Sequence, residues 1–173
     1  MRIISGKWRG RPIKAPTGTE TRPTSERARE ALFSMLASRV GSFEGLRVCD
    51  LFAGTGALGL EALSRGAAHC TFVEQDRYAL EALKANIAAF GADATVRAQA
   101  AEHFKGGPFD LVFADPPYDS GLGHRALGGL VLAPGAFASL ETSRVESSGL
   151  PGFEIEAERK YGKAKITLLR RID

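Results

Sequence analysis

The chain has 173 residues, of which 44% are hydrophobic and 25% are charged. These proportions are ordinary for one globular domain with its own core, and no apolar run reaches the roughly 20 residues that a membrane-spanning helix requires. The first residues are basic but no apolar segment follows them, so we expect no secretory signal and a cytoplasmic protein. Cys49 and Cys70 lie in apolar surroundings, which predicts buried, reduced thiols.

Positive charge is concentrated near the N-terminus. Residues 1–40 contain nine Lys and Arg but only three Glu, whereas the whole chain carries a net charge of only +3. A basic end on a body that is otherwise slightly acidic favours a polyanion as the partner. The alternative at this point is a solvated surface that is basic by chance.

The first 40 residues predict a small β element followed by one helix. Residues 2–4 and 11–14 flank a turn with two glycines, which is the pattern of a short hairpin. The stretch 22–26 has the residues of a helix start, and an apolar stripe at helical spacing continues to about residue 39. We expect residues 1–40 to form an extension that packs on a domain of residues 41–173.

From residue 41 onward the sequence alternates between strand and helix patterns, as in an open α/β sheet with right-handed crossovers. Apolar runs predict strands at 47–52, 70–74, 95–97, 110–114 and 137–141, and helices at 57–65 and 76–90. Two alternating runs, 153–160 and 163–170, then flank Tyr161-Gly162 and predict an antiparallel hairpin. The sheet is therefore expected to be mostly parallel with an antiparallel end.

The stretch 50–63, DLFAGTGALGLEAL, contains a glycine-rich turn between a predicted strand and a predicted helix. Gly54, Gly56 and Gly59 fit the pattern G-x-G-x-x-G, and Glu74 lies twenty positions after Gly54. Such glycines let a ligand approach the backbone, the helix start supplies N–H donors, and the acid can accept hydrogen bonds from ribose hydroxyls. The pattern indicates a cofactor that contains adenosine. A dinucleotide and a ligand-free turn are the alternatives.

A second motif, Asp115-Pro116-Pro117-Tyr118, follows the predicted strand 110–114. The prolines make a rigid turn without backbone N–H donors, so the Asp115 carboxylate and the Pro116 carbonyl present two acceptors. Tyr118 adds a flat surface. Two acceptors beside an aromatic ring suit a planar group with an exocyclic amino group, and hydride transfer has no use for that set. The motif argues against a dehydrogenase, and a plain Pro-Pro turn is the alternative.

The sequence resembles a known family at these motifs and near its start. The stretches DLFAGTG and DPPY are similar to those of class I S-adenosylmethionine-dependent methyltransferases that modify amino groups. The leading RIISGKWRGRPIKAP, RPT at 22–24, RAREALF at 27–33 and KYG at 160–162 resemble the 16S ribosomal RNA (guanine-N2) methyltransferases of the RsmD type. The resemblance covers essentially the whole chain. DPPY is shared with DNA adenine, RNA and protein-glutamine methylases, so the N-terminal stretch is what narrows the substrate.

The resemblance implies a Rossmann-like sheet of seven strands that ends in an antiparallel hairpin, with S-adenosylmethionine as the cofactor. It implies that the cofactor crosses the strand ends with its ribose on Glu74. The cofactor-binding candidates near the first two strands are Asp50, Phe52, Gly54, Thr55, Gly56, Glu74 and Gln75. Such enzymes often carry an acid after the third strand, near the adenine amino group. In this sequence Gln99, Glu102 or backbone groups are the alternatives for that contact.

The implied substrate is the N2 amino group of a guanine in 16S ribosomal RNA, within the small subunit or its precursor. In this hypothesis the base lies against Tyr118, and its amino group donates to Asp115 and to the Pro116 carbonyl. The basic extension is expected to bind RNA phosphates. Trp8 packs either on a base or sugar or, alternatively, against the domain. The candidates for RNA contact are Arg2, Lys7, Trp8, Arg9, Arg11, Arg22, Arg27 and Arg29.

Two other functions stay open, a DNA adenine-N6 methyltransferase and a non-catalytic RNA-binding assembly factor. These 173 residues leave room for no separate target-recognition domain, which argues against the first. The intact Asp115 and glycine loop argue against the second. His69, His103 and His124 are scattered without zinc spacing, so we expect no metal site. A monomer is the default expectation.

Overall fold

The structure, a computed structural model, describes residues 1–16 and 26–172. Its sheet consists of β1 (Arg47–Leu51), β2 (His69–Glu74), β3 (Ala94–Ala98), β4 (Phe109–Ala114), β5 (Leu132–Ser143), β6 (Phe153–Tyr161) and β7 (Ala164–Arg171). The strand order is β3-β2-β1-β4-β5-β7-β6, with parallel pairing from β3 through β5. β7 pairs antiparallel with both β5 and β6. The prediction of a mostly parallel sheet with an antiparallel hairpin is confirmed.

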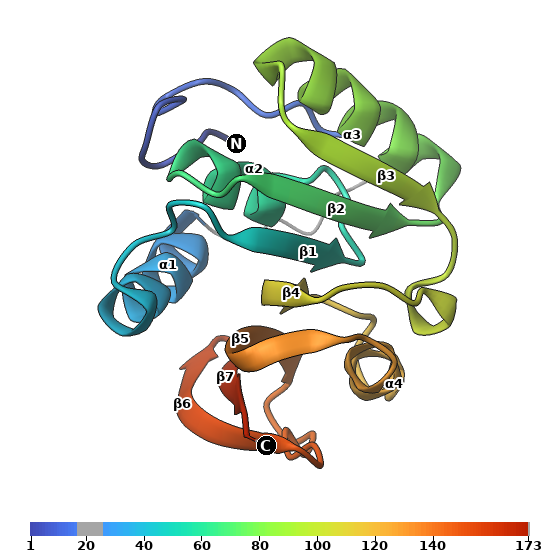
Figure 1. Ribbon diagram of the computed structural model, residues 1–173. Coiled ribbons are helices and arrows are strands. Elements are labelled where there is room, and N and C mark those ends of the chain that lie inside the picture. Colours follow the sequence, from blue (N-terminus) through green and yellow to red (C-terminus); the bar gives the residue numbers. More distant parts are fainter. Residues whose placement is uncertain (17–25, 173) are drawn as a thin grey trace.

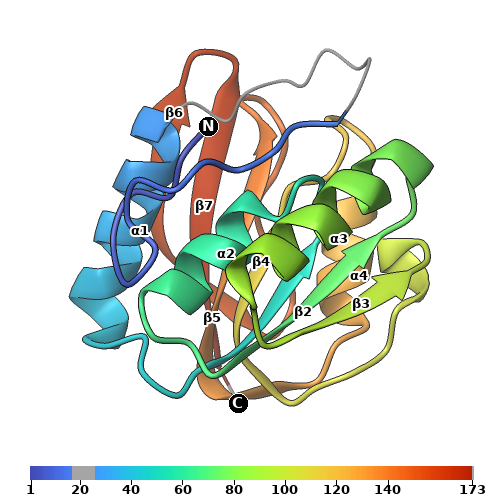
Figure 2. The same cartoon turned by 90° about the horizontal axis from the view of Figure 1, so that it is seen from above.

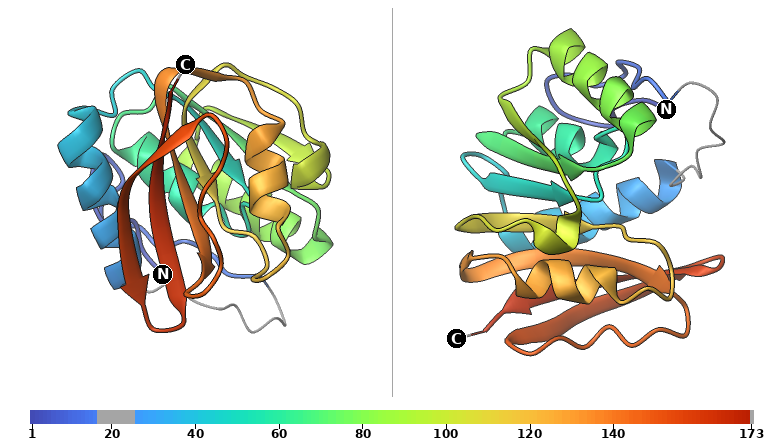
Figure 3. Two further views of the ribbon diagram at one scale, coloured as in Figure 1. Left: turned by 90° about the horizontal axis from the view of Figure 1, so that it is seen from below. Right: turned by 90° about the vertical axis from the view of Figure 1, so that its right-hand side faces the viewer.

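Helices cover both faces of this sheet (Figure 1). Side chains of α1 (Glu26–Val40), α2 (Ala57–Ser64) and α3 (Arg77–Phe90) share one hydrophobic core with one face. Side chains of α4 (Leu122–Gly128) and of the 3₁₀ helix η1 (Ala101–His103) share a second core with the other face. Figure 1 and the right view of Figure 3 show α1 and α4 on opposite sides of the sheet. Within the described residues, no helix has the length and apolar character to cross a membrane.

Helix α4 and strand β5 differ from the sequence prediction. Helix α4 was not expected, because its seven residues, LGHRALG, are too short for a helical period to stand out. Strand β5 begins at Leu132 rather than near residue 137, because Pro134 and Gly135 interrupt the strand pattern. Gly135 has φ +75°, and the pairing of β5 with β4 shifts register beside it. In both cases glycine or proline weakens the sequence pattern of an element whose structural neighbours are distant in the sequence.

The N-terminal segment, residues 1–16, crosses α2 and α3 on the outside of the molecule (Figure 2). Its expected hairpin is present as one antiparallel bridge between Arg2 and Pro12, with hydrogen bonds from Ile3 N–H to the Arg11 carbonyl and from Ile13 N–H to the Met1 carbonyl on either side. Three of its side chains are buried in the same core as α1, α2 and α3, namely Ile3, Trp8 and Ile13. Gly6 lies so close to α2 that a Cβ atom there would stand 2.0 Å from the Ser64 carbonyl oxygen. The division of the chain between residues 40 and 41 stays a prediction.

Parallel pairing brings three strand ends to one edge of the sheet. Leu51 pairs with both Val73 and Ala114. The glycine loop after β1, Glu74 at the end of β2 and the Asp-Pro-Pro-Tyr turn after β4 therefore lie close together. This carboxyl-terminal edge is where open α/β sheets bind ligands.

Candidate active site

The loop between β1 and α2 is a tight turn that only glycine can complete. Gly56, the residue before α2, has φ +86°, and a Cβ atom there would stand 2.6 Å from Leu83 Cδ1. Its N–H donates to the Ala53 carbonyl at 2.9 Å, which closes the turn. Phe52 also has a positive φ, 56°, which is uncommon for a residue with a side chain. The first turn of α2 is thereby placed directly after the end of β1, with its backbone N–H groups near the sheet edge.

Glu74 joins this loop to the end of β2. Its Oε1 atom accepts a hydrogen bond from Gly54 N–H at 2.8 Å. Its Oε2 atom accepts from Gln75 N–H at 3.0 Å and from Asp76 N–H at 2.9 Å. A carboxylate has about four acceptor positions, so three backbone bonds leave capacity for a further donor. The spacing of twenty residues in the sequence thus corresponds to a direct contact across two strands.

Asp50 is buried beneath the same loop. Its Oδ2 atom accepts a hydrogen bond from Gly59 N–H at 2.9 Å. Burial raises the pKa of the Asp50 carboxyl well above its ordinary value, the bond from Gly59 lowers it, and the charges of Asp115 and Glu74 raise it further. Asp115 and Glu74 therefore disfavour the ionised form of Asp50. A cationic ligand nearby would favour its ionised form.

A cavity of about 350 Å³ opens at this edge. Its lining includes five of the cofactor-binding and catalytic candidates, namely Asp50, Phe52, Gly54, Thr55 and Asp115. Asp76 adds a third carboxylate, and Met1 and Pro16 of the N-terminal segment also line it. Its size falls in the usual range for pockets that bind small molecules, about 300–1,000 Å³. Over residues 1–16 and 26–172, no three His, Cys, Asp or Glu side chains gather in a way that could hold a metal ion.

The alternatives for an adenine contact lie after β3. Gln99 N–H donates to the Glu74 carbonyl at 3.1 Å, so this segment runs beside the end of β2. Glu102 belongs to η1, and its Oε2 atom is buried without a hydrogen-bond partner. A buried acceptor without a donor is uncommon in folded proteins. Among the alternatives, Glu102 therefore has the stronger structural argument.

The Asp-Pro-Pro-Tyr turn leads directly away from β4. Asp115 lines the main cavity and also a smaller one behind it that Glu141 and Ser139 complete. The Tyr118 hydroxyl donates to Glu141 Oε2 at 2.9 Å, which fixes one end of the ring. Sequence reasoning missed Glu141, because its role depends on β5 lying beside β4. Pro116 is buried and Pro117 is exposed, so the turn itself separates the core from the surface.

Most candidates for RNA contact are exposed on the N-terminal segment and on α1. These are Arg2, Lys7, Arg9, Arg11 and Arg27. Arg22 lies outside the described residues. The structure does not support RNA contact by Trp8 or Arg29, because both side chains are buried. Trp8 packs on Phe90 with their ring centroids 4.9 Å apart, so the alternative of packing against the domain holds.

Further basic residues that the sequence reasoning did not select lie around the turn of the β6–β7 hairpin. Arg144, Lys160 and Lys163 are all exposed there, and Arg144 Nη1 donates to the Gly162 carbonyl at 3.1 Å. Ser143 pairs with Ala164 and donates from its hydroxyl to Asp119 at 3.0 Å, which ties this turn to the segment after Tyr118. Figures 2 and 3 show the hairpin turn and Met1 at the same end of the molecule.

The sheet order, the glycine loop with its acidic partner and the Asp-Pro-Pro-Tyr turn together define a class I methyltransferase. A solved structure of the ribosomal protein L11 methylase from Lactobacillus delbrueckii superposes with a TM-score of 0.71 over 93% of this chain and 86% of that chain. Its identity is only 17%, so this likeness shows the fold alone.

Closer relatives give the family. The family model Conserved hypothetical protein 95 matches residues 1–170. Ribosomal RNA small subunit methyltransferase D of Escherichia coli is 40% identical over 99% of this chain and 90% of its own length, and that of Haemophilus influenzae is 37% identical over 83% and 79%. The structure of the hypothetical protein TTHA0928 from Thermus thermophilus is 35% identical, with a TM-score of 0.78 over 97% of this chain and 98% of that chain. The chain belongs to this family and is a methyltransferase of the RsmD type.

Proposed function

We propose that this protein transfers a methyl group from S-adenosylmethionine to the N2 amino group of a guanine in 16S ribosomal RNA. Its relatives in Escherichia coli and Haemophilus influenzae are named ribosomal RNA small subunit methyltransferases, which supports ribosomal RNA as the substrate class. The observation that carries the reaction is the position of Asp115. Its side chain lines the cavity of the glycine loop, and the aromatic ring of Tyr118 follows three residues later.

The residues around the cavity fit this cofactor. The carboxylates of Asp50, Asp76 and Asp115 suit its sulfonium and ammonium charges, and Glu74 has acceptor capacity for its ribose. The buried Oε2 atom of Glu102 lacks the donor that an adenine amino group would supply. When bound, S-adenosylmethionine supplies a methyl group on a positively charged sulfur, which is a good leaving group.

The protein's own contribution is to hold the acceptor nitrogen. The Asp115 carboxylate and the Pro116 carbonyl accept hydrogen bonds from the exocyclic amino group and fix its direction. Tyr118, whose hydroxyl is held by Glu141, offers its ring as the surface on which the base lies. Positioning and electrostatic stabilisation are then sufficient, because attack places positive charge on a nitrogen that readily loses its proton afterwards.

RNA binding is assigned to exposed basic residues of the N-terminal segment, of the start of α1 and of the hairpin turn. These are Arg2, Lys7, Arg9, Arg11 and Arg27, with Arg144, Lys160 and Lys163 on the hairpin side. Each phosphate contact that is lost should lower the slope of log affinity against log salt by about one unit. We expect this reduction in Arg9→Glu and not in Arg47→Glu, because Arg47 begins β1 at the opposite edge of the sheet. Equal slopes for both variants and the wild type would remove Arg9 from the RNA surface.

The function is tested by transfer of labelled methyl groups to three substrates in parallel. These are unmodified small ribosomal subunits, free 16S ribosomal RNA and duplex DNA. We expect label in ribosomal RNA, and comparison of the first two substrates shows whether an assembled surface is needed. Label in DNA would agree with the proposed role of Asp115 but would contradict the proposed substrate. Binding of RNA without any transfer would favour the non-catalytic assembly factor.

A further inference from the structure

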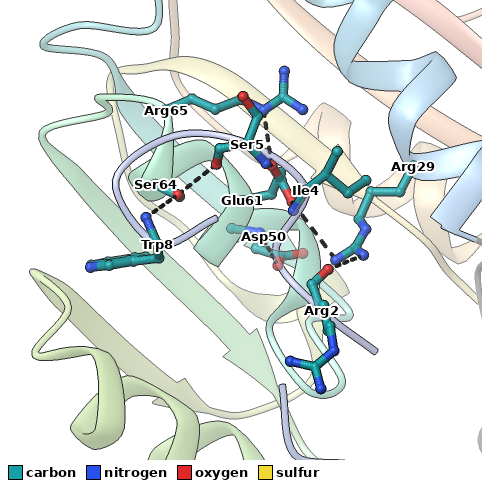
Figure 4. Close-up of polar contacts among 10 residues, drawn as sticks. Arg2, Ile4, Ser5, Trp8, Arg29, Asp50, Glu61, Ser64 and Arg65 are labelled. Atoms are coloured by element: carbon teal, nitrogen blue, oxygen red, sulfur yellow. Dashed lines mark hydrogen bonds and ion pairs between the residues drawn. The ribbon is translucent and has the colours of Figure 1, made fainter. Parts of the chain in front are cut away.

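The side chain of Arg29 is buried without enough acceptors. It is 1% exposed, in the second turn of α1, and its Nη2 atom donates to the Arg2 carbonyl at 2.5 Å. Its Nε and Nη1 atoms are both buried and have no hydrogen-bond partner. Figure 4 shows this guanidinium between Arg2 and Glu61. An arginine carries five N–H donors and cannot release its charge, so two unpaired buried nitrogens are costly.

Glu61 does not supply the hydrogen-bond acceptors that the Arg29 side chain lacks. Its Oε1 atom already accepts from Ile4 N–H at 2.9 Å, and its Oε2 atom accepts from Ser5 N–H and from Arg65 Nε, each at 3.0 Å. The nearest approach of Arg29 is 3.9 Å, from Nη1 to Oε1, which exceeds the length of a hydrogen bond. Glu61 therefore balances the charge of Arg29 in part and leaves its donors unpaired.

The unpaired donors belong to a side chain that lines the cofactor cavity. Arg29 is part of that lining together with Asp50 and Asp115. Of the described residues that line it, Arg29 alone has a basic side chain. Burial lowers the pKa of the Arg29 guanidinium, and the charges of Glu61 and Glu26 raise it in part. The described lining of the cavity thus has one basic side chain among several acids, and we expect its ligand to carry one anion among cationic groups.

We propose that Arg29 binds the α-carboxylate of the methionine part of the cofactor. This rests on the proposed use of S-adenosylmethionine, which carries a sulfonium, an ammonium and one carboxylate. A carboxylate is the acceptor that a guanidinium pairs with best, and here it would satisfy donors that the protein leaves unpaired. The acids around it would face the two cationic groups of the same ligand.

The same contact links cofactor binding to the N-terminal segment. Arg29 donates a hydrogen bond to the Arg2 carbonyl, and Glu61 accepts hydrogen bonds from the backbone amides of Ile4 and Ser5. Met1 and Pro16 of this segment also line the cavity. A ligand that fixes Arg29 therefore also fixes the segment, and carboxylate binding should slow the hydrogen exchange of Ile4 and Ser5 amides.

The test compares two ligands, S-adenosylhomocysteine and its decarboxylated analogue, which keeps the ammonium group. Titration calorimetry on the wild type should show at least about tenfold weaker binding of the analogue, since a hydrogen-bonded charge pair is lost. In Arg29→Gln this preference should fall to about twofold or less. Arg65→Gln is the matched control, because Arg65 contacts the same Glu61 and does not line the cavity. It should keep the preference.

Three results would overturn the proposal. Equal binding of both ligands by the wild type would remove the carboxylate contact while leaving the cofactor assignment intact. An undiminished preference in Arg29→Gln would place the carboxylate elsewhere. If the wild type bound neither ligand, the cofactor assignment itself would fail and this proposal with it.

A measurement on the wild type alone covers the case in which Arg29→Gln does not fold. S-adenosylhomocysteine should protect the Ile4 and Ser5 amides from exchange more strongly than the saturating analogue does. Equal protection by the two ligands would contradict the link through Arg29.

Discussion

Two regions around α2 each contain a buried acid, and they differ in what surrounds it. Glu61 accepts three hydrogen bonds, from Ile4, Ser5 and Arg65, and has the Arg29 guanidinium close by. Asp50 accepts a bond from Gly59 and lies near two further acids, Asp115 and Glu74. The first acid is surrounded by donors that belong to the protein. The second adjoins a cavity whose described lining has three carboxylates and one basic side chain.

The difference separates anchoring from ligand binding. An acid whose oxygens accept hydrogen bonds from the protein's own donors stabilises one conformation. Here it stabilises the docking of the N-terminal segment onto α2. An acid with like-charged neighbours and an open cavity is destabilised until a cation arrives. Arg29 belongs to both regions, because it lies near Glu61 and lines the cavity with Asp50. The following predictions test this separation, starting with the largest effect.

Asp115→Asn should abolish methyl transfer and leave the fold unchanged. We expect a loss of about 10²–10⁴-fold in rate, the usual contribution of a positioned acid or base. The affinity for S-adenosylhomocysteine should change less than about twofold, because the other cavity residues remain. Asp110→Asn is the control, since Asp110 lies at the opposite end of the same strand and caps Arg47 N–H. Transfer by Asp115→Asn at the rate of this control would disprove the role of Asp115.

Unlike Asp115→Asn, which leaves the fold unchanged, Glu61→Gln should have a large effect on stability. The amide nitrogen that replaces one oxygen cannot accept from Ser5 N–H or Arg65, and Arg29 loses the charge of its ion-pair partner. Breaking a buried pair costs about 3–5 kcal/mol, which lowers the melting temperature by about 6–20 °C in a chain of this size. Calorimetric melting is the measurement, with Glu154→Gln as a control at an exposed ion pair. Equal melting temperatures for the two variants would show that Glu61 is not an anchor.

Gly6→Ala should detach the N-terminal segment without touching either acid. The added Cβ would stand 2.0 Å from the Ser64 carbonyl oxygen, where only backbone can move. Gly10→Ala is a matched control, because Gly10 also has a positive φ, +81°, but its Cβ would meet nothing within 4 Å. We expect Gly6→Ala to be less stable than Gly10→Ala by about 1–3 kcal/mol, the usual cost of overpacking. Similar values for both would mean that the close approach to α2 is not important.

Asp50→Asn should change the pH dependence of stability. The pKa of Asp50 is raised in the folded protein, so folding favours its protonated form. The wild type is therefore most stable relative to this variant below about pH 4, near the unfolded pKa. As the pH rises above that value, the wild type should lose up to about 1.4 kcal/mol per pH unit against Asp50→Asn until Asp50 ionises in the folded state. Urea unfolding of both proteins between pH 4 and 8 measures this. A constant difference would show that Asp50 is not perturbed.

Much of the sheet edge could be predicted from the sequence, because the motifs there are local. The turn at Gly56, the acid Glu74 and the Asp-Pro-Pro-Tyr turn each follow a strand whose apolar run is short and distinct. Parallel pairing then places strand ends side by side, so local patterns were enough to bring Asp115 to the glycine loop.

The contacts that could not be predicted join residues far apart in the chain. Arg29 and Trp8 look like RNA-binding residues in a basic segment, but their burial depends on Glu61 and Phe90. Glu61 lies inside an apolar helix, where nothing in the sequence shows that two backbone amides and two arginines will meet it. Glu141 likewise gains its partner, Tyr118, only because β5 lies beside β4.

The most direct test of the account is the chemical identity of the methylated nucleoside. Unmodified small ribosomal subunits would be treated with the wild-type protein and S-adenosylmethionine, and the RNA digested for mass spectrometry. The account predicts N2-methylguanosine with the wild type and none with Asp115→Asn. A methyl group on an adenine or cytosine amino group, on a ring carbon or on a ribose would contradict it.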